Sequence, residues 1–310
     1  MTIALHFATP RKLPKAKELV GRVVVLDVAF ASETGGASFE TTTRPFLRSL
    51  GDRLAAWVDH HDSAHHAEFA DDPRFLLTTK AEHGACPELV TPELVARIGP
   101  VDTLVCHGDF DGLMSAAKWL RGGAEPYPGA DADARAIDTR VGTPSPLADR
   151  LDRALRARPR DTSLPLAIVR FLEGGASDAA LLAEVDRAAA ELDAHEREAR
   201  RIAEGFAVFD EAPGALAFVD ATKHQGPYDK TLLLLLGQTR ARVAAVLDDD
   251  TLTLAAPFES GVNFLDTLGL SGGMPTRVSL PRKRMTATLT ALGLPPSAIA
   301  PLPVVERTRR

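Results

Sequence analysis

The 310-residue sequence has few cysteines and no long hydrophobic run. Its two cysteines, Cys86 and Cys106, are too few for a disulfide framework, and their spacing matches no zinc motif. The longest apolar block, residues 232–236, is far shorter than the roughly 20 residues of a membrane-spanning helix. Residues 1–22 lack the apolar core of a signal peptide. We therefore expect a soluble protein of the reducing cytoplasm, without a membrane partner.

The sequence also lacks an excess of basic charge. Its formal net charge of −6 argues against a general nucleic-acid coat or a membrane-surface protein, although a locally basic cleft is compatible with it. Hydrophobic residues make up 45% and charged residues 25%, which is ordinary for a globular chain. The length suits about two domains.

The first half of the sequence contains apolar segments that each end at a side chain able to bind a metal ion. Helical stretches separate these segments, a pattern that predicts a mostly parallel α/β sheet. Ligands of such sheets bind at the carboxyl edge, so the strand ends are predicted to converge. The segments are residues 23–26 before Asp27, 55–58 before Asp59 and His60, 104–105 near His107, and 134–137 before Asp138.

The second half of the sequence begins with a helical pattern. Apolar residues recur at helical spacing over residues 186–206, and a break follows at residues 212–214. Residues 215–220, 243–247 and 251–255 are predicted strands. Residues 248–250 are three aspartates, which we interpret as a hairpin turn, with a metal site as the alternative. We expect a catalytic α/β domain over residues 1–150, a helical linker over 151–212 and a smaller α/β domain over 213–310.

Asp109 and Asp111 are the most informative pair of residues in the chain. They follow the strand at residues 101–105 and precede a helix predicted over residues 113–120. Two carboxylates in that position suit divalent metal ions. The alternative is a helix N-cap followed by an acidic residue in the first turn.

Hydrolysis of a phosphodiester or pyrophosphate by two metal ions, roughly 4 Å apart, needs carboxylates and one or two imidazoles. Oxygen and imidazole ligands without a thiolate favour Mn²⁺ or Mg²⁺. The alternative to a metal-binding role for Asp27 is an ordinary turn residue. For residues 59–61 it is a polar end of a strand. The predicted donors are Asp27, His60, Asp109, Asp111 and Asp138.

A glycine pair near the C-terminus has two interpretations. Gly272 and Gly273 fit an ordinary loop between a strand and a helix. They also fit a backbone nest whose N–H groups hold a phosphate, with Arg277 and Arg282 nearby as anion contacts.

These residues resemble the motifs of the DHH phosphoesterase superfamily. The segment from His107 to Ala116, with its aspartate pair and the following Gly and Ser-Ala, is similar to the first motif. Asp27 resembles the bridging aspartate of the second. Residues 59–61, Asp-His-His, resemble the third, in which the first histidine binds metal and the second meets the substrate phosphate. The resemblance implies a catalytic role for Asp59 and His61.

The resemblance extends to two further regions and has three departures. Asp138 is similar to the aspartate of the fourth motif, and residues 272–273 resemble the glycine signature of the DHH-associated C-terminal domain. The motif order is permuted, since Asp27 and the Asp-His-His triplet precede the aspartate pair. His107 lies two residues before Asp109, where many members have it four before. Met274 stands where the family commonly has histidine.

The resemblance implies a metal-dependent phosphodiesterase, with two Mn²⁺ ions expected, that cleaves short single-stranded oligonucleotides or small nucleotides. His107 is included among the implied metal ligands. Two alternatives remain at this point: a soluble inorganic pyrophosphatase, and a catalytically silent nucleotide-binding protein on the same scaffold. The choice between DNA, RNA and cyclic dinucleotides is open, as are the polarity of cleavage and the oligomeric state.

Overall fold

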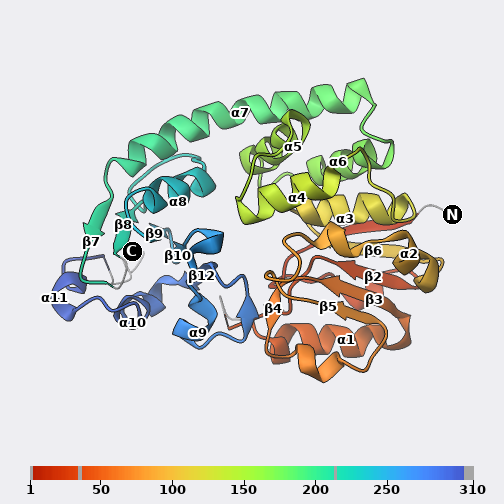
Figure 1. The fold of residues 1–310 in the computed structure, drawn as a ribbon, viewed down its shortest axis with the longest axis horizontal. Coiled ribbons are helices and arrows are strands. Elements are labelled where there is room, and N and C mark those ends of the chain that lie inside the picture. Colours follow the sequence, from red (N-terminus) through yellow and green to blue (C-terminus); the bar gives the residue numbers. More distant parts are fainter. Residues whose placement is uncertain (1–2, 34–36, 213–214, 304–310) are drawn as a thin grey trace. The chain divides into compact units, whose positions relative to one another are not determined.

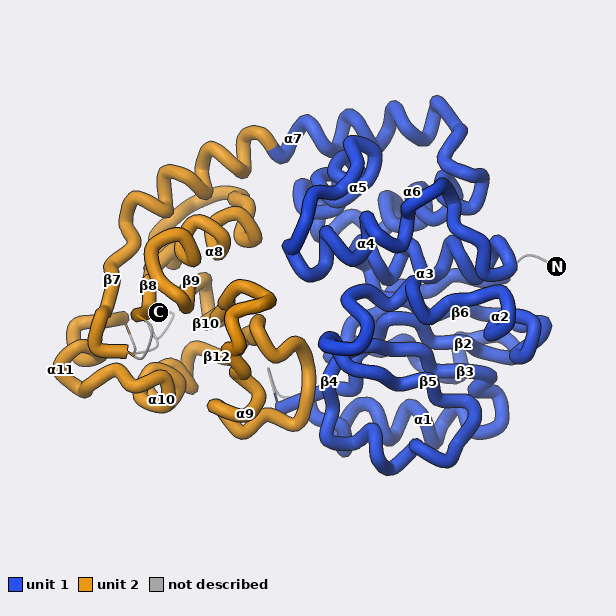
Figure 2. The backbone as a smooth tube through the Cα atoms, viewed as in Figure 1, with its two compact units in different colours: residues 1–33, 37–192 blue, residues 34–36, 193–310 orange. Residues whose placement is uncertain are grey.

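The computed structural model describes residues 3–33, 37–212 and 215–303. These residues form two compact units (Figures 1 and 2): unit 1 contains residues 3–33 and 37–192, and unit 2 contains residues 193–212 and 215–303. Each unit has helices and its own five-stranded sheet, so the predicted α/β class is confirmed. The functional division at residues 150 and 212 stays a prediction, and residues 213–214 of the predicted break lie outside the described chain.

Unit 1 is built on a sheet in which every pair of neighbouring strands is parallel, in the order β1-β6-β2-β3-β5. The strands of this sheet are β1 (Ala4–Ala8), β2 (Val23–Leu26), β3 (Leu54–Asp59), β5 (Phe75–Leu77) and β6 (Thr103–His107). The short strand β4 (Asp62–Ser63) of unit 1 is not part of it. The helices of unit 1 are α1 (Arg44–Leu50), α2 (Pro92–Ile98), α3 (Phe110–Leu120), α4 (Ala130–Thr139), α5 (Pro146–Ala157), α6 (Leu164–Glu173) and the first part of α7 (Ala179–Ala203).

Both faces of this sheet are buried, which explains its continuous apolar strands. Val24 and Leu26 of β2 belong to the hydrophobic cluster that includes residues of α3 to α6, whereas Val23 and Val25 belong to the cluster on the α1 side (Figure 1). The two tryptophans lie on opposite faces: Trp57 in the α1-side cluster and Trp119 of α3 in the other. Both are buried.

The structure corrects one of the four predicted strands of the first half. Residues 134–137 are helical and belong to α4, not to the sheet. Ala130, Ala134 and Ile137 are buried at helical spacing and pack in the same cluster as α3, so helical packing decides this segment. The strands predicted at residues 23–26, 55–58 and 104–105 are confirmed as parts of β2, β3 and β6.

Unit 2 has a mixed sheet in the order β12-β10-β9-β8-β7, in which only β8 and β9 run parallel. The strands of this sheet are β7 (Ala207–Phe209), β8 (Leu216–Asp220), β9 (Val243–Asp248), β10 (Thr251–Ala255) and β12 (Arg277–Pro281). The short strand β11 (Gly272–Gly273) of unit 2 is not part of it. The helices of unit 2 are the end of α7, α8 (Lys230–Gln238), α9 (Phe264–Leu268), α10 (Met285–Ala291) and α11 (Pro296–Ile299).

The three adjacent aspartates of unit 2 form a hairpin turn, as predicted. Asp248 ends β9 and pairs with Thr251 at the start of the antiparallel strand β10. Asp249 has a φ of 47°, the left-handed conformation that Asp tolerates in tight turns. Among the described residues, the groups that could hold a metal ion include none of these three aspartates.

Candidate metal centre

Polar side chains follow three neighbouring strands of the unit 1 sheet. In the order β6-β2-β3, His107 is the last residue of β6, Asp27 follows β2, and His60 and His61 follow β3. Parallel strands present their carboxyl ends at one edge of a sheet, so these residues lie together despite their separation in sequence. The predicted convergence is therefore present for these three strands.

The turn from β6 into α3 places the aspartate pair at the same edge. Asp109 is the N-cap of α3, and its carboxylate accepts a hydrogen bond from the Gly112 N–H at 3.4 Å. Asp109 therefore caps the helix, and its role as a metal ligand stays a prediction. Asp111 in the first turn makes a different contact, with its Oδ2 3.3 Å from His60 Nε2. Gly112 is required because a Cβ there would lie 2.6 Å from the carbonyl oxygen of His107.

His60 is the centre of the inner part of the site. Its Nε2 lies 3.2 Å from Asp27 Oδ1 and 3.8 Å from Asp138 Oδ2, in addition to the Asp111 contact. Its Nδ1 lies 2.9 Å from the carbonyl oxygen of His83, to which Nδ1–H can donate. This bond leaves the lone pair of a neutral ring on Nε2, the arrangement found at metal-binding histidines.

His107 and His61 occupy the more open part of the site. His107 Nδ1 lies 2.7 Å from Asp109 Oδ2 and 3.7 Å from Asp27 Oδ2. His61 Nδ1 lies 2.8 Å from Asp59 Oδ1 and 3.8 Å from Asp27 Oδ1. The Asp109 side chain is 47% exposed and that of His107 27%, whereas Asp27 is fully buried. Solvent therefore reaches this part of the cluster.

Asp27 has the least ordinary environment of these residues. Its φ of 57° is in the left-handed region, which is uncommon outside glycine and clusters at functional sites. Both of its carboxylate oxygens are buried and accept no hydrogen bond from any described residue. Burial raises the pKa of Asp27 well above its usual range, and the nearby charges of Asp111 and Asp109 raise it further. A bound cation would satisfy this carboxylate, so the residues fit a metal ion.

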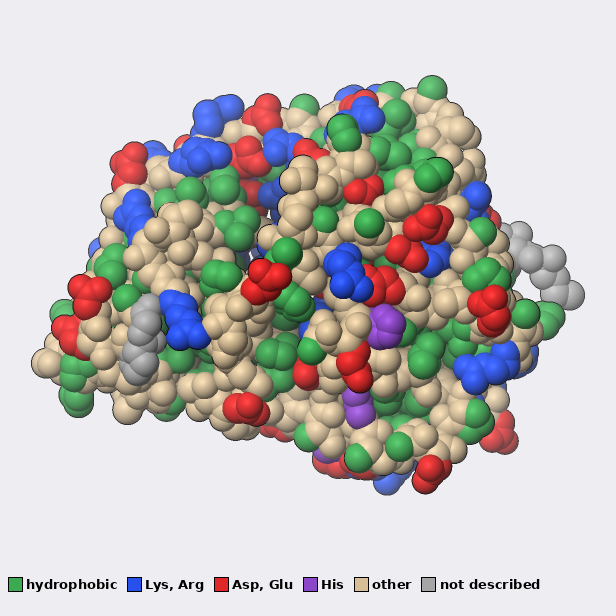
Figure 3. All heavy atoms as spheres, in the orientation of Figure 1, with side chains coloured by type: hydrophobic (Ala, Val, Ile, Leu, Met, Phe, Trp, Pro, Cys, Tyr) green, Lys and Arg blue, Asp and Glu red, His purple; other side chains and the backbone are tan. Residues whose placement is uncertain are grey.

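The structure brings all the predicted metal ligands into groups whose ligand atoms lie within 4.8 Å of one another. Only oxygen and imidazole donors take part, a set suited to Mn²⁺ or Mg²⁺. Their role as ligands stays a prediction. Figure 3 shows histidine and acidic side chains close together on the displayed face of unit 1. The groups are Asp27, His60 and His61; Asp27, His107 and Asp109; and His60, Asp111 and Asp138.

Lys80 is a residue of this cluster that the sequence analysis missed. Its side chain is buried, its Nζ lies 2.9 Å from His60 Nε2, and it forms an ion pair with Asp138. Burial lowers the pKa of the Lys80 ammonium, but the charges of Asp138, Asp111 and Asp27 outweigh burial and raise the pKa above its usual value. A sequence signal exists: Lys80 follows β5, the next strand beside β3, and so approaches the same edge.

The predicted substrate-binding residues lie in unit 2. Gly272 and Gly273 form β11, and Gly273 has a φ of 121° that favours glycine. Arg277 begins β12 at an exposed position. Arg282 is buried, and its Nε donates to the carbonyl oxygen of Pro303 at 3.0 Å. Contact of these residues with substrate stays a prediction.

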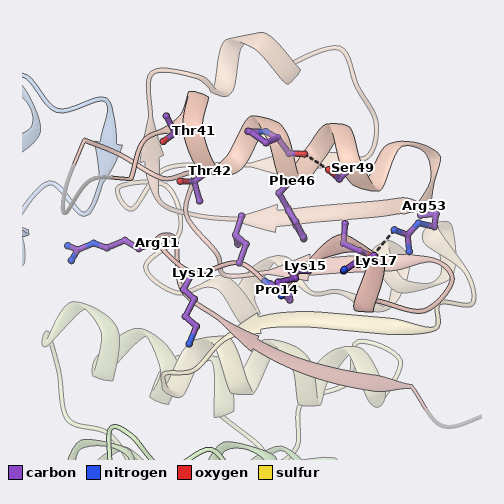
Figure 4. A pocket seen from close by; sticks show the side chains of 13 residues that line it. Arg11, Lys12, Pro14, Lys15, Lys17, Thr41, Thr42, Phe46, Ser49 and Arg53 are labelled. Carbon is purple, nitrogen blue, oxygen red and sulfur yellow. Dashed lines mark hydrogen bonds between the residues drawn. The ribbon is translucent and has the colours of Figure 1, made fainter.

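A separate cavity of about 690 Å³ in unit 1 is lined by basic side chains (Figure 4). Lys12, Lys15 and Lys17 are exposed at its wall, whereas Arg53 donates hydrogen bonds to the carbonyl oxygens of Ala16 and Leu19. The cavity shares no lining residue with the Asp-His cluster.

None of the described helices combines the length and the apolar character that a membrane span requires. No protein-family model matches the sequence, and no curated protein matches it. Among solved structures, the chain is similar to the pGpG-specific phosphodiesterase PggH of Vibrio cholerae, with a TM-score of 0.40 and 12% identity. The match covers 88% of this chain and 97% of that one.

Proposed function

We propose that this chain is a metal-dependent phosphodiesterase that hydrolyses short oligonucleotides or small nucleotides, with Mn²⁺ as the preferred ion. One observation carries the proposal. The buried carboxylate of Asp27 accepts no hydrogen bond from the described residues, yet imidazoles and further carboxylates surround it. A polar group buried in this way is costly unless a cation satisfies it.

The donor group of Asp27, His107 and Asp109 is the part of the cluster that a substrate can reach, because Asp109 and His107 are partly exposed. A divalent ion held there supplies a Lewis acid that lowers the pKa of the attacking water and neutralises charge on the phosphate. The role of these three side chains is to hold the ion at the edge of the sheet. The rigid strands β2 and β6 fix two of them.

Asp59 and His61 form a pair beside this group. Asp59 is buried and accepts from His61 Nδ1 at 2.8 Å, which orients the imidazole and leaves Nε2 to contact the substrate phosphate or carry a proton. Burial opposes ionisation of Asp59, but the interactions with His61, together with those of His60 and His66, outweigh burial and lower the pKa of the carboxyl. Asp59 therefore remains the charged partner of His61.

Small anionic substrates fit the chain better than long nucleic acids. A long duplex calls for an extended basic surface, whereas the net charge here is −6. Gly272, Gly273, Arg277 and Arg282 stay the predicted phosphate contacts in this proposal. Arg282 has to exchange its bond to the Pro303 carbonyl for such a contact.

Hydrolysis of a substrate panel in the presence of Mn²⁺ tests the proposal. The panel contains bis-p-nitrophenyl phosphate, pyrophosphate, a linear dinucleotide, a cyclic dinucleotide and a short single strand. We expect cleavage of a nucleotide substrate and a loss of at least about 100-fold in Asp109→Asn, which keeps the helix cap but removes the charged ligand.

The matched control is Asp149→Asn, which alters an exposed acid in the first turn of α5, outside the cluster. It is expected to leave hydrolysis unchanged. Equal activity in wild type and Asp109→Asn would contradict the proposal. Cleavage of pyrophosphate alone would assign the pyrophosphatase activity in its place.

A further inference from the structure

The inner donor group of the cluster, His60, Asp111 and Asp138, differs from the outer one, Asp27, His107 and Asp109, in that it already contains a cationic side chain. The ammonium of Lys80 makes an ion pair with Asp138, and its Nζ is 2.9 Å from His60 Nε2. It therefore contacts two of the three inner donors.

The position of Lys80 is fixed by its surroundings. Its side chain is 2% exposed, and its backbone N–H donates to Asp62 Oδ2 at 3.3 Å. The residue follows β5, which pairs with β3 in parallel register up to Asp59 and Leu77. The strand that precedes the lysine thus lies directly beside the strand that precedes His60.

An ammonium and a metal ion compete for the same donor atom at His60. His60 Nε2 is the ring nitrogen that faces Asp111 and Asp138, and Lys80 Nζ lies 2.9 Å from it. If Nε2 accepts from Lys80, it has no second lone pair for a metal ion. Lys80 Nζ therefore lies where an ion bound to His60 Nε2 and Asp138 would have to lie.

The outer group has no such occupant. Within the described ranges, no lysine or arginine forms an ion pair with Asp27, His107 or Asp109. Asp109 and His107 are partly exposed, so an ion can enter and retain positions for water and phosphate.

From these contacts we infer that the Lys80 ammonium takes the place of one of the two expected metal ions, so that the chain binds a single divalent ion at Asp27, His107 and Asp109. This inference rests on the proposed function, because it concerns the metal site of that function. Lys80 acts as a built-in cation that neutralises part of the inner charge and positions His60 and Asp138. The catalytic ion and the substrate then share the open side of the cluster.

Manganese stoichiometry tests the inference without an activity assay. Chelator-treated protein is dialysed against Mn²⁺, bound manganese is measured by elemental analysis, and the spin state is read by electron paramagnetic resonance. We expect wild type to bind about one ion with a mononuclear spectrum, and Lys80→Ala to bind about two with the exchange-coupled spectrum of a manganese pair.

Lys118→Ala is the matched control, since Lys118 is also buried in unit 1, forms an ion pair with Asp131 at 2.7 Å and belongs to none of the donor groups. It should retain about one ion. If Lys80→Ala does not fold, Lys80→Gln removes the same charge with less loss of volume, and the same gain is expected.

The possible outcomes test the role of Lys80 separately from the proposed function on which it rests. A manganese pair in wild type, with hydrolysis of the nucleotide panel intact, overturns the role of Lys80 and leaves the proposed function standing. One ion in both wild type and the folded Lys80 variant also overturns it. Absence of bound manganese together with absence of hydrolysis removes the proposed function itself.

Discussion

The sheets of unit 1 and unit 2 both place an aspartate at the end of a parallel strand, but the two carboxylates have opposite surroundings. Asp220 ends β8, and its Oδ1 accepts from the N–H and the hydroxyl of Thr222 at 2.9 and 2.6 Å. Asp27 follows β2 and accepts no hydrogen bond from the residues that are described. Asp220 is satisfied by its own loop, whereas Asp27 has an environment that calls for a cation.

The difference follows from the strand directions. Three adjacent strands of the unit 1 sheet end in polar residues at one edge, whereas unit 2 has a single parallel pair, β8 and β9. At the end of β9, Asp248 forms an ion pair with Lys230 at 3.4 Å. A strand-end aspartate is thus a site candidate only where neighbouring strands add donors and no local group satisfies it.

The largest effect is expected for Asp27→Asn. This variant keeps the left-handed backbone, which Asn tolerates, but removes the carboxylate shared by two donor groups. Hydrolysis should fall at least about 1,000-fold. Measurement of kcat/KM with Mn²⁺ checks this, with Asp220→Asn as the matched variant. If kcat/KM fell by a similar factor in Asp27→Asn and Asp220→Asn, the proposed difference between the strand-end aspartates of the two sheets would be wrong.

The same substitution is expected to stabilise the metal-free protein. The pKa of Asp27 is raised in the folded chain, so the folded state holds this proton more tightly than the unfolded state does. Stability is therefore lost as the pH rises above the unfolded value of about 3.9, and removal of the charge by Asp27→Asn restores it. Urea unfolding with chelator at acidic and neutral pH should show a larger gain at neutral pH.

Manganese is expected to stabilise the folded protein through unit 1. At a concentration of about 100 times the dissociation constant, the gain is about 2.7 kcal/mol, a factor of about 100 in the folding equilibrium. Calorimetric melting with and without Mn²⁺ measures this gain. Asp220→Asn should retain the shift and Asp27→Asn should lose it; an equal shift in the two would place the ion elsewhere.

A smaller effect is expected for Asp59→Asn. Loss of the charge that holds His61 Nδ1 should lower kcat about 10–100-fold, the scale for residues that orient active-site groups. Bound manganese should not change, because Asp59 belongs to none of the donor groups. Loss of manganese in step with kcat would instead give Asp59 a purely structural role.

The smallest effect is expected for Asp220→Asn itself. Its turnover should stay within about twofold of wild type, since its carboxylate accepts hydrogen bonds from Thr222 in its own loop. The cost to stability should be at most about 1 kcal/mol, because the amide oxygen of Asn can still accept both hydrogen bonds from Thr222. Steady-state kinetics and urea unfolding measure both quantities.

The sequence was sufficient to predict the edge of the unit 1 sheet at which the buried apolar strands end. Strands β2, β3 and β6 are continuous apolar runs with a polar residue at the end, so both the strands and the proximity of Asp27, His60 and His107 could be predicted. The fold of residues 134–137 could not, because a short alanine-rich segment fits a strand or a helix, and packing against α3 decides.

The place of Lys80 in the cluster was not predicted, for a chemical reason. A search for metal ligands looks for carboxylates, imidazoles and thiolates, and an ammonium is none of these. Strand β5 has only three residues, so its place beside β3 was not evident from its length. The available signal was that β3 and β5 are close in sequence and pair in the sheet, so residues that follow them approach the same edge.

The position of the two tryptophans gives the chain a built-in optical probe. Trp57 and Trp119 are the only tryptophans of the sequence, and both are buried in unit 1 on opposite faces of its sheet. The Trp57 indole donates to the carbonyl oxygen of Val28, one residue after Asp27. Emission excited at the indole band therefore reports the melting of unit 1 alone, while circular dichroism follows both units. Spectroscopic comparison of the two signals can resolve their unfolding without a label.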